Sequence, residues 1–144
     1  MQLSKHFSYK ELTVSEIAER RGLNNTPSPS EIINLTRLAA FLEKVRAVIG
    51  KPIVVNSAFR SKSVNEAVGS KESSQHRIGC AADIRVIGMN PDEICKAIID
   101  SDLQYDQLIR EFDSWVHISV PSTPNIEPRQ QALIIDRSGT RPYK

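Results

Sequence analysis

The chain has 144 residues, of which 40% are hydrophobic and 25% charged, and its formal net charge is +2. This length suits one ordinary domain that buries a core without disulfides, and the composition is that of a globular protein. The small net charge argues against a nucleic-acid partner, and no apolar run approaches the roughly 20 residues that span a bilayer.

Neither the N-terminus nor the two cysteines indicate export. Residues 1–7 lack the apolar stretch of a secretory signal, so we expect a protein that is cytoplasmic as synthesised. Cys80 and Cys95 are not spaced as a metal-binding pair, and we expect two reduced thiols buried in the core. We also expect a monomer without a membrane span.

Three S/T-x-x-E capping boxes mark helix starts in the N-terminal third, at Ser8, Thr13 and Ser28. The first two predict one or two short helices over 9–21 that stop at Gly22. The third, with Pro29 at the first helical position, predicts a helix that runs to Ile49 and ends at Gly50. Its apolar residues recur every three or four positions and predict a stripe that faces the core: Ile32, Leu35, Leu38, Leu42, Val45 and Ile49.

After residue 52 the pattern changes to short strands. We expect strands at 53–56, 81–86, 107–110, 115–120 and 132–135, and a helix that begins at Pro91 after an Asn90 cap. Residues 57–74 are polar and predict a long loop with a short helix near 64–68. Loops of this length in compact domains are usually functional.

The chemistry of the chain is concentrated in His76, Asp83 and His117. Two imidazoles and one carboxylate suit a catalytic zinc ion that keeps one coordination position open for water. Strand alternation places Asp83 and His117 opposite the apolar residues of their strands, and so on the face turned away from the core. A lone histidine on a strand is more often a hydrogen-bonded or surface residue, and the spacing between His76 and Asp83 is not specific by itself.

The residues around this set supply the specificity. Residues 74–83 (SQHRIGCAAD) resemble the S-x-H-x-x-G-x-A-x-D signature of the D-alanyl-D-alanine carboxypeptidase and dipeptidase superfamily of zinc peptidases. Residues 57–61 (SAFRS) resemble its S-G-Y-R-S motif, and residues 115–117 (WVH) resemble its closing W-x-H. The order and spacing also match, and the similarity is to the small single-domain members common in bacteriophages and prophages.

The resemblance implies one α+β domain over residues 1–144, with the fold shared by D-Ala-D-Ala peptidases and hedgehog-like signalling domains. This fold is an antiparallel sheet flanked by helices, with a zinc cleft on one face. Zn²⁺ would be bound by His76, Asp83 and His117, and Gly79 would allow a tight turn between the first two ligands.

The implied function is hydrolysis of a peptide bond in the stem peptide of bacterial peptidoglycan, as a D-Ala-D-Ala carboxypeptidase. One alternative is a peptidoglycan endopeptidase that cuts at L-Ala–D-Glu or in the crosslink, as a phage endolysin does. Another is a non-catalytic wall-binding or virion structural module. As a peptidase, the protein would act on the cell wall.

Further roles follow from the same resemblance. Arg60 would bind the substrate carbonyl, the developing oxyanion or a carboxylate, because its planar fork suits each of them. Ser74 and Gln75 would orient ligands or line the substrate groove. Trp115 would wall the cleft, or it is a half-buried structural residue.

The general base is left open between two acids. Several relatives place an acid three positions before the last histidine, where this chain has Ser114. Glu111 and Asp113 each lie an even number of residues before His117, so their side chains would lie on the same face as His117 if the segment stays extended. Glu111 also matches the acid of the phage-type branch.

Other polar residues have weaker patterns. His6 lies in a polar segment and is expected to pack or hydrogen-bond rather than bind a metal. Four basic residues are expected to form a solvated face or to touch an anionic substrate: Lys62, Lys71, Arg77 and Arg85.

Overall fold

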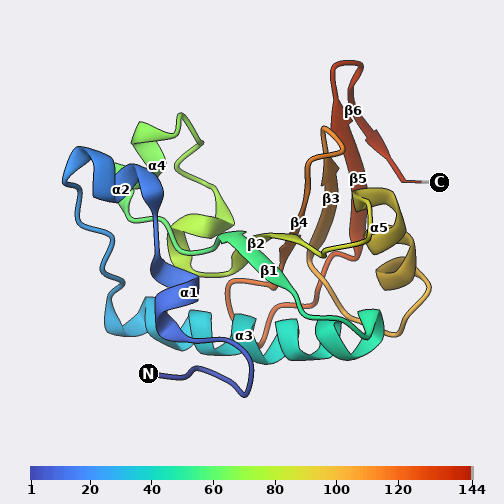
Figure 1. Ribbon diagram of the computed structural model, residues 1–144, viewed down its shortest axis with the longest axis horizontal. Coiled ribbons are helices and arrows are strands. Elements are labelled where there is room, and N and C mark those ends of the chain that lie inside the picture. Colours follow the sequence, from blue (N-terminus) through green and yellow to red (C-terminus); the bar gives the residue numbers. More distant parts are fainter. Residues whose placement is uncertain (144) are drawn as a thin grey trace.

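The computed structural model describes residues 1–143 and shows a mixed α+β fold built on a six-stranded sheet (Figure 1). In chain order its elements are α1 (Tyr9–Thr13), α2 (Glu16–Arg21), α3 (Pro29–Ile49), β1 (Val54–Ser57), α4 (Lys62–Ala67), the 3₁₀ helix η1 (Gln75–Ile78), β2 (Ala81–Arg85), α5 (Pro91–Ile99), β3 (Gln107–Glu111), β4 (Trp115–Ser119), β5 (Gln131–Asp136) and β6 (Gly139–Pro142).

The helices begin and end where local chemistry favours it. The predicted capping boxes at Ser8 and Ser28 are formed, and α3 ends at Gly50 in the left-handed conformation. The predicted box at Thr13 is wrong, because Ser15 caps α2 by accepting a hydrogen bond from the Ala18 N–H. Asn90 caps α5 as expected.

The sheet has the strand order β1-β2-β4-β3-β5-β6. Neighbouring strands are antiparallel except β3 and β5, which are parallel, so the sheet is mostly antiparallel and the expected α+β architecture is confirmed. Because β4 is antiparallel to β3, it ends at the edge of the sheet where β3 starts. β5 begins at that same edge, on the other side of β3, and therefore runs parallel to β3. The sequence patterns did not predict β6, which pairs with β5 as a hairpin.

The core lies between one face of the sheet and the helices α3 and α5. The predicted stripe of α3 is buried at Leu35, Leu38, Leu42 and Val45. It meets the alternate apolar residues of the central strands, which include Ala82, Ile84, Leu108, Val116 and Ile118. In Figure 1, α3 runs along the base of the molecule, and α4 lies at the opposite end from β5 and β6. The other face of the sheet is left free for a site.

Strand and loop boundaries differ from the sequence expectation by a few residues. β1 begins at Val54 rather than residue 53, α4 spans Lys62–Ala67 rather than 64–68, and η1 was not predicted. Cys80 and Cys95 are free and buried, as expected. Among the described residues, no helix is both long and apolar enough to cross a membrane.

Candidate metal centre

Three elements bring His76, Asp83 and His117 together, and these residues form what we call the His-Asp-His cluster. His76 lies on η1, whose first turn is capped by the Ser74 side chain. Asp83 and His117 are direct partners in the register of β2 with β4, so both side chains lie on the same face of the sheet. The alternation of apolar residues places this face opposite the core, as expected.

Gly79 ends η1 and directs the chain into β2. Its φ of +82° lies in the left-handed region, and an added Cβ would lie 2.9 Å from the Glu31 carbonyl oxygen of α3. Both facts favour glycine at this position. The tight turn expected between His76 and Asp83 is therefore present.

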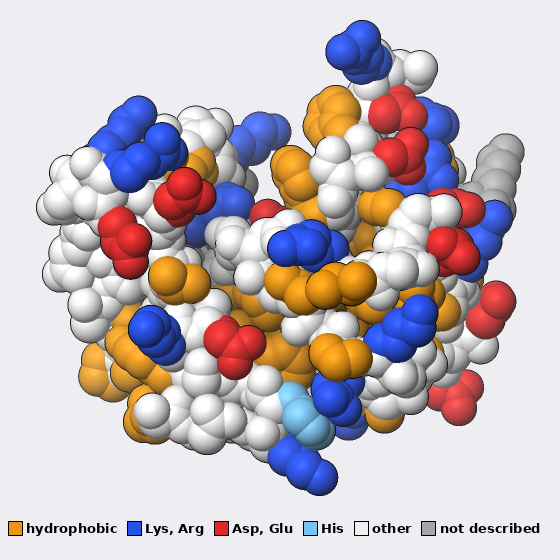
Figure 2. Space-filling model, viewed as in Figure 1, with side chains coloured by type: hydrophobic (Ala, Val, Ile, Leu, Met, Phe, Trp, Pro, Cys, Tyr) orange, Lys and Arg blue, Asp and Glu red, His pale blue; other side chains and the backbone are white. Residues whose placement is uncertain are grey.

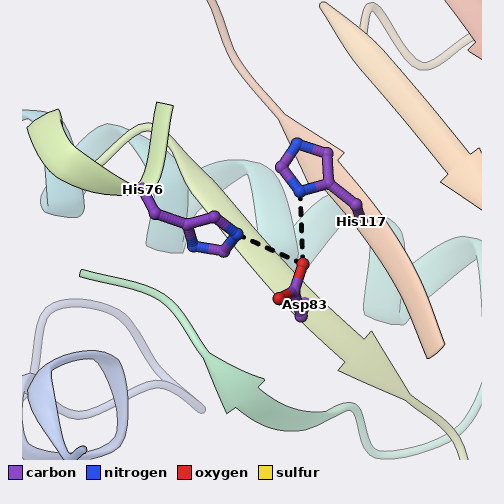
Figure 3. Close-up of side chains that lie close together, drawn as sticks. All are labelled: His76, Asp83 and His117. Carbon is purple, nitrogen blue, oxygen red and sulfur yellow. Dashed lines mark hydrogen bonds and ion pairs between the residues drawn. The ribbon is translucent and has the colours of Figure 1, made fainter. Parts of the chain in front are cut away.

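The cluster is compact and buried. His76 Nε2 and His117 Nδ1 each lie 3.2 Å from Asp83 Oδ1, and the two rings point at that oxygen from different sides (Figure 3). The three residues are only 3%, 7% and 8% exposed, in chain order. One ligand atom from each residue lies within 4.8 Å of the others.

The hydrogen bond of the second ring nitrogen sets the tautomer of His76. Nδ1 lies 2.7 Å from the Ala58 carbonyl oxygen, which is only an acceptor, so Nδ1 carries the proton. In the neutral ring, the Nε2 lone pair then faces the carboxylate of Asp83. Two acceptors that face each other in a buried site need a cation between them.

The electrostatics of the cluster favour a neutral imidazole beside an ionised carboxylate. Burial lowers the pKa of His76, and the hydrogen bond and charge of Asp83 oppose this effect only in part. Burial alone would raise the pKa of Asp83, but its interactions with the His117 and His76 rings outweigh this effect and lower that pKa. Neutral imidazole and carboxylate are the protonation states that bind a metal ion.

The donor set therefore fits a divalent metal. Two nitrogen donors and one oxygen donor match the three protein ligands of catalytic zinc sites. The Ala58 carbonyl that holds His76 acts as the outer partner that usually orients such a ligand.

Arg60 lies beside the cluster. Its Nη2 donates to Asp83 Oδ2 at 3.3 Å, its Nε donates to Ser57 Oγ at 3.3 Å, and its backbone N–H donates to the His76 carbonyl. The guanidinium thus occupies the second oxygen of Asp83 and leaves Oδ1 to the two histidines.

The structure separates the two candidate bases. The segment after β3 does not stay extended, because Phe112 and Asp113 have φ angles of 53° and 51°. Asp113 therefore does not lie on the same face as His117 through strand alternation, as the sequence predicted. Asp113 is exposed and pairs with Arg110. Glu111 is half-buried on the same face as His117, and burial together with the charge of Asp83 raises its pKa.

The remaining predicted groove residues lie around the cluster. Ser74 accepts a hydrogen bond from the His76 N–H, and Gln75 Nε2 donates to Asp106 and to the Val120 carbonyl. The indole N–H of Trp115 is buried and has no acceptor within residues 1–143.

A cleft of about 560 Å³ opens beside His117, between the segment 70–75 and the strands β3 and β5. Figure 2 shows the molecule hollowed between the part that carries α2 and α4 and the protruding strands. Arg129 lines this cleft and pairs with the buried Asp106. The sequence analysis identified neither residue. The one available signal was the position of Asp106 directly before β3.

The comparison with protein families agrees with this geometry. A family model described as Peptidase M15 matches residues 5–119, which is most of the chain and includes the whole His-Asp-His cluster. No curated protein gives a significant match.

Proposed function

Since this chain belongs to the Peptidase M15 family, we propose that it is a zinc enzyme that hydrolyses a peptide bond in the stem peptide of bacterial peptidoglycan. Membership makes it a peptidase with a candidate metal site, and the sequence motifs favour D-Ala-D-Ala carboxypeptidase activity at the cell wall. They also favour the branch carried by phages and prophages. The observation that supports the proposal most strongly is the convergence of His76 Nε2 and His117 Nδ1 on one oxygen of Asp83.

The His-Asp-His cluster would hold the zinc. When bound, zinc supplies Lewis-acid polarisation of the peptide carbonyl and acidifies a water molecule. Burial lowers the pKa of His76, the Ala58 carbonyl fixes its tautomer, and the two imidazoles that face Asp83 lower the pKa of that carboxylate. The candidate ligands are thus prepared by their neighbours.

Glu111 is the proposed general base. Its carboxylate lies on the face of the sheet that carries His117, two residue pairs along the β3–β4 ladder. There it would take a proton from the attacking water and pass it to the leaving amine. Burial raises its pKa, which favours temporary storage of that proton.

Arg60 is the proposed electrophilic partner. Its guanidinium is fixed by Ser57 and Asp83, so its direction is set before a substrate arrives. Such a preorganised donor stabilises the negative charge that develops on a carbonyl oxygen.

Two substrates distinguish the candidate activities. A carboxypeptidase releases D-Ala from a soluble pentapeptide, whereas an endopeptidase solubilises intact sacculi and leaves a cut stem peptide or crosslink. We expect release of D-Ala by the wild type and by His6→Ala, and none by His76→Ala. Failure to cleave either substrate by a zinc-loaded protein would favour the non-catalytic wall-binding or virion module.

A further inference from the structure

The cleft beside His117 is lined by cations and hydroxyls. Lys71 and Arg129 are its two charged residues, and none of the described residues that line it is acidic. Its uncharged polar lining consists of three serines and two glutamines: Ser70, Ser73, Ser74, Gln75 and Gln107. Ile109 and Ile135 of the sheet contribute an apolar part of the wall. A peptide that occupies this cleft lies next to the His-Asp-His cluster, because His117 lines both.

Arg129 is held in place by a buried carboxylate. Its Nη2 lies 2.7 Å from Asp106 Oδ2, and its Nε lies 3.1 and 3.2 Å from the two oxygens of Asp106. Asp106 is only 4% exposed. This pair uses one side of the guanidinium, and Nη1 has no hydrogen-bond partner within residues 1–143. The end formed by Nη1 and Nη2 can therefore receive a second carboxylate in the bidentate manner.

The backbone around Arg129 is also fixed. The Arg129 N–H donates to Asp106 Oδ1, and the next residue, Gln130, has a φ of +53°. A non-glycine residue in this region is strained and persists only where its surroundings impose it. Here the Gln130 N–H donates to the Tyr105 carbonyl and the Gln131 N–H to the Asp106 carbonyl.

The same carboxylate connects Arg129 to the candidate metal centre. Asp106 Oδ2 accepts a hydrogen bond of 2.9 Å from Gln75 Nε2, and Gln75 directly precedes His76. Asp106 thus contacts both Arg129 and the residue that precedes His76. The distance between the Arg129 guanidinium and His76 is therefore set by the folded chain rather than by the substrate.

Lys71 supplies the uncompensated charge of the cleft. Asp106 balances the charge of Arg129, whereas the ammonium of Lys71 forms no ion pair with any residue from 1 to 143. The Lys71 carbonyl accepts hydrogen bonds from the Ser74 N–H and from Asn65 Nδ2, which fixes its backbone. The cleft therefore carries a net positive charge.

We infer that this cleft is a specificity subsite that binds a carboxylate of the peptide substrate through the free end of Arg129 and through Lys71. This inference rests on the proposed peptidase function. A stem peptide with lysine at its third position offers two such carboxylates, the C-terminal one and the α-carboxylate of D-Glu, and both have the same chemistry. Asp106 is a positioning residue in this arrangement, because it acts on the substrate only through Arg129.

Matched peptides test the subsite. In one pair of stem pentapeptides the C-terminus is a carboxylate or an amide, with the D-Glu carboxyl blocked as an amide. In the other pair the D-Glu α-carboxyl is free or an amide, with the C-terminus blocked. Each peptide is titrated into the full chain in the presence of a chelator, which prevents cleavage, and kcat/KM is measured separately with the zinc-loaded chain.

We expect the wild type to bind the free acid of one pair about tenfold more tightly than its amide, which identifies the source of the carboxylate. Arg129→Gln and Lys71→Gln should each reduce this preference and leave the affinity for the amide unchanged. Arg141→Gln is the matched control, because Arg141 also pairs bidentately with an aspartate, Asp136, but lies on β6 outside the cleft.

The outcomes separate the subsite from the function. Equal affinity of the wild type for acid and amide in both pairs would overturn the subsite, and so would a preference that survives in the double variant of Arg129 and Lys71. If the zinc-loaded chain cleaves none of the peptides, the proposed function fails, while the titrations still decide whether the carboxylate is recognised.

Discussion

At the scale of single residues, the turn between β3 and β4 distinguishes Glu111, which the sequence favoured as the base, from Asp113, which it left as the second candidate. Glu111 ends β3 on the face of the candidate metal centre, whereas the left-handed conformations of Phe112 and Asp113 turn Asp113 toward Arg110. Because neither residue is a glycine, no pattern in the sequence marked this turn. Position on the sheet therefore favours Glu111 as the base.

Glu111→Gln tests this assignment. It removes the proton acceptor and keeps the shape of the side chain, so we expect kcat to fall about 10²- to 10⁴-fold with little change in the melting temperature. Asp113→Asn is the matched control and should retain activity within about twofold. Retention of activity in Glu111→Gln, with loss in Asp113→Asn, would reverse the assignment.

Gly79 offers a test of how tightly the ligand segment is packed. Gly79→Ala places a Cβ 2.9 Å from the Glu31 carbonyl at a φ of +82°. We expect a loss of at least about 2 kcal/mol in the free energy of unfolding, measured by urea titration. Gly50→Ala has a similar φ but open space around it, and it should cost only about 1 kcal/mol. Equal losses in the two variants would show that the contact with α3 is unimportant.

Among the site residues, those within the three motifs could be identified from the sequence, and those that support them could not. The motifs contain His76, Asp83, His117 and Arg60, and the fold places all four side by side. Ala58 and Asp106 act on the site through a backbone carbonyl and a contact between distant segments. Such contacts leave no local pattern.

At the scale of elements, one carboxylate of α3, that of Glu43, holds several polar groups of the N-terminal segment. Glu43 accepts hydrogen bonds of 2.6 Å from Ser4 Oγ and from the His6 N–H, and it pairs with His6 Nδ1. Partial burial alone would raise the pKa of Glu43, but these bonds and the charge of His6 lower it from 4.5 to about 2. His6 thus has the structural role expected from its sequence context.

Glu43→Gln should change the dependence of stability on pH. A carboxyl whose pKa is lower in the folded state stabilises the protein above its unfolded value of 4.5 and loses this effect as the pH falls toward 2. We expect the variant to be less stable by about 1 kcal/mol near pH 6, after allowance for solvent screening. The difference should shrink below about pH 4 in urea titrations. A difference that stays constant or grows as the pH falls would contradict this account.

Helices were predicted better than the sheet because their signals are local. The bounds of α3 follow from its cap, its first proline and its terminal glycine. The parallel pairing of β3 with β5 depends on the route of the chain through residues 120–130, and β6 is a short exposed hairpin strand without apolar alternation. Neither feature has a local sequence signal.

At the scale of the whole molecule, a bound metal would link parts of the chain that fold from distant segments. The cluster joins η1, β2 and β4. A ligand that binds only the folded state at about a hundred times its Kd adds about 2.7 kcal/mol to stability. For a domain of this size we expect zinc to raise the melting temperature by roughly 5–10 °C. His76→Ala should abolish this shift, and His6→Ala should keep it. An equal shift in His76→Ala would place the metal elsewhere.

The central claim is that zinc held by His76, Asp83 and His117 is required for peptide-bond hydrolysis. Mass spectrometry of muropeptides incubated with the purified protein tests it most directly, because it reports the cleaved bond and the metal dependence together. We predict that the wild type produces a single class of cleavage product, that a chelator abolishes it, and that added zinc restores it in the wild type but not in His76→Ala. Undiminished cleavage by His76→Ala, or by the chelated wild type, would contradict the claim.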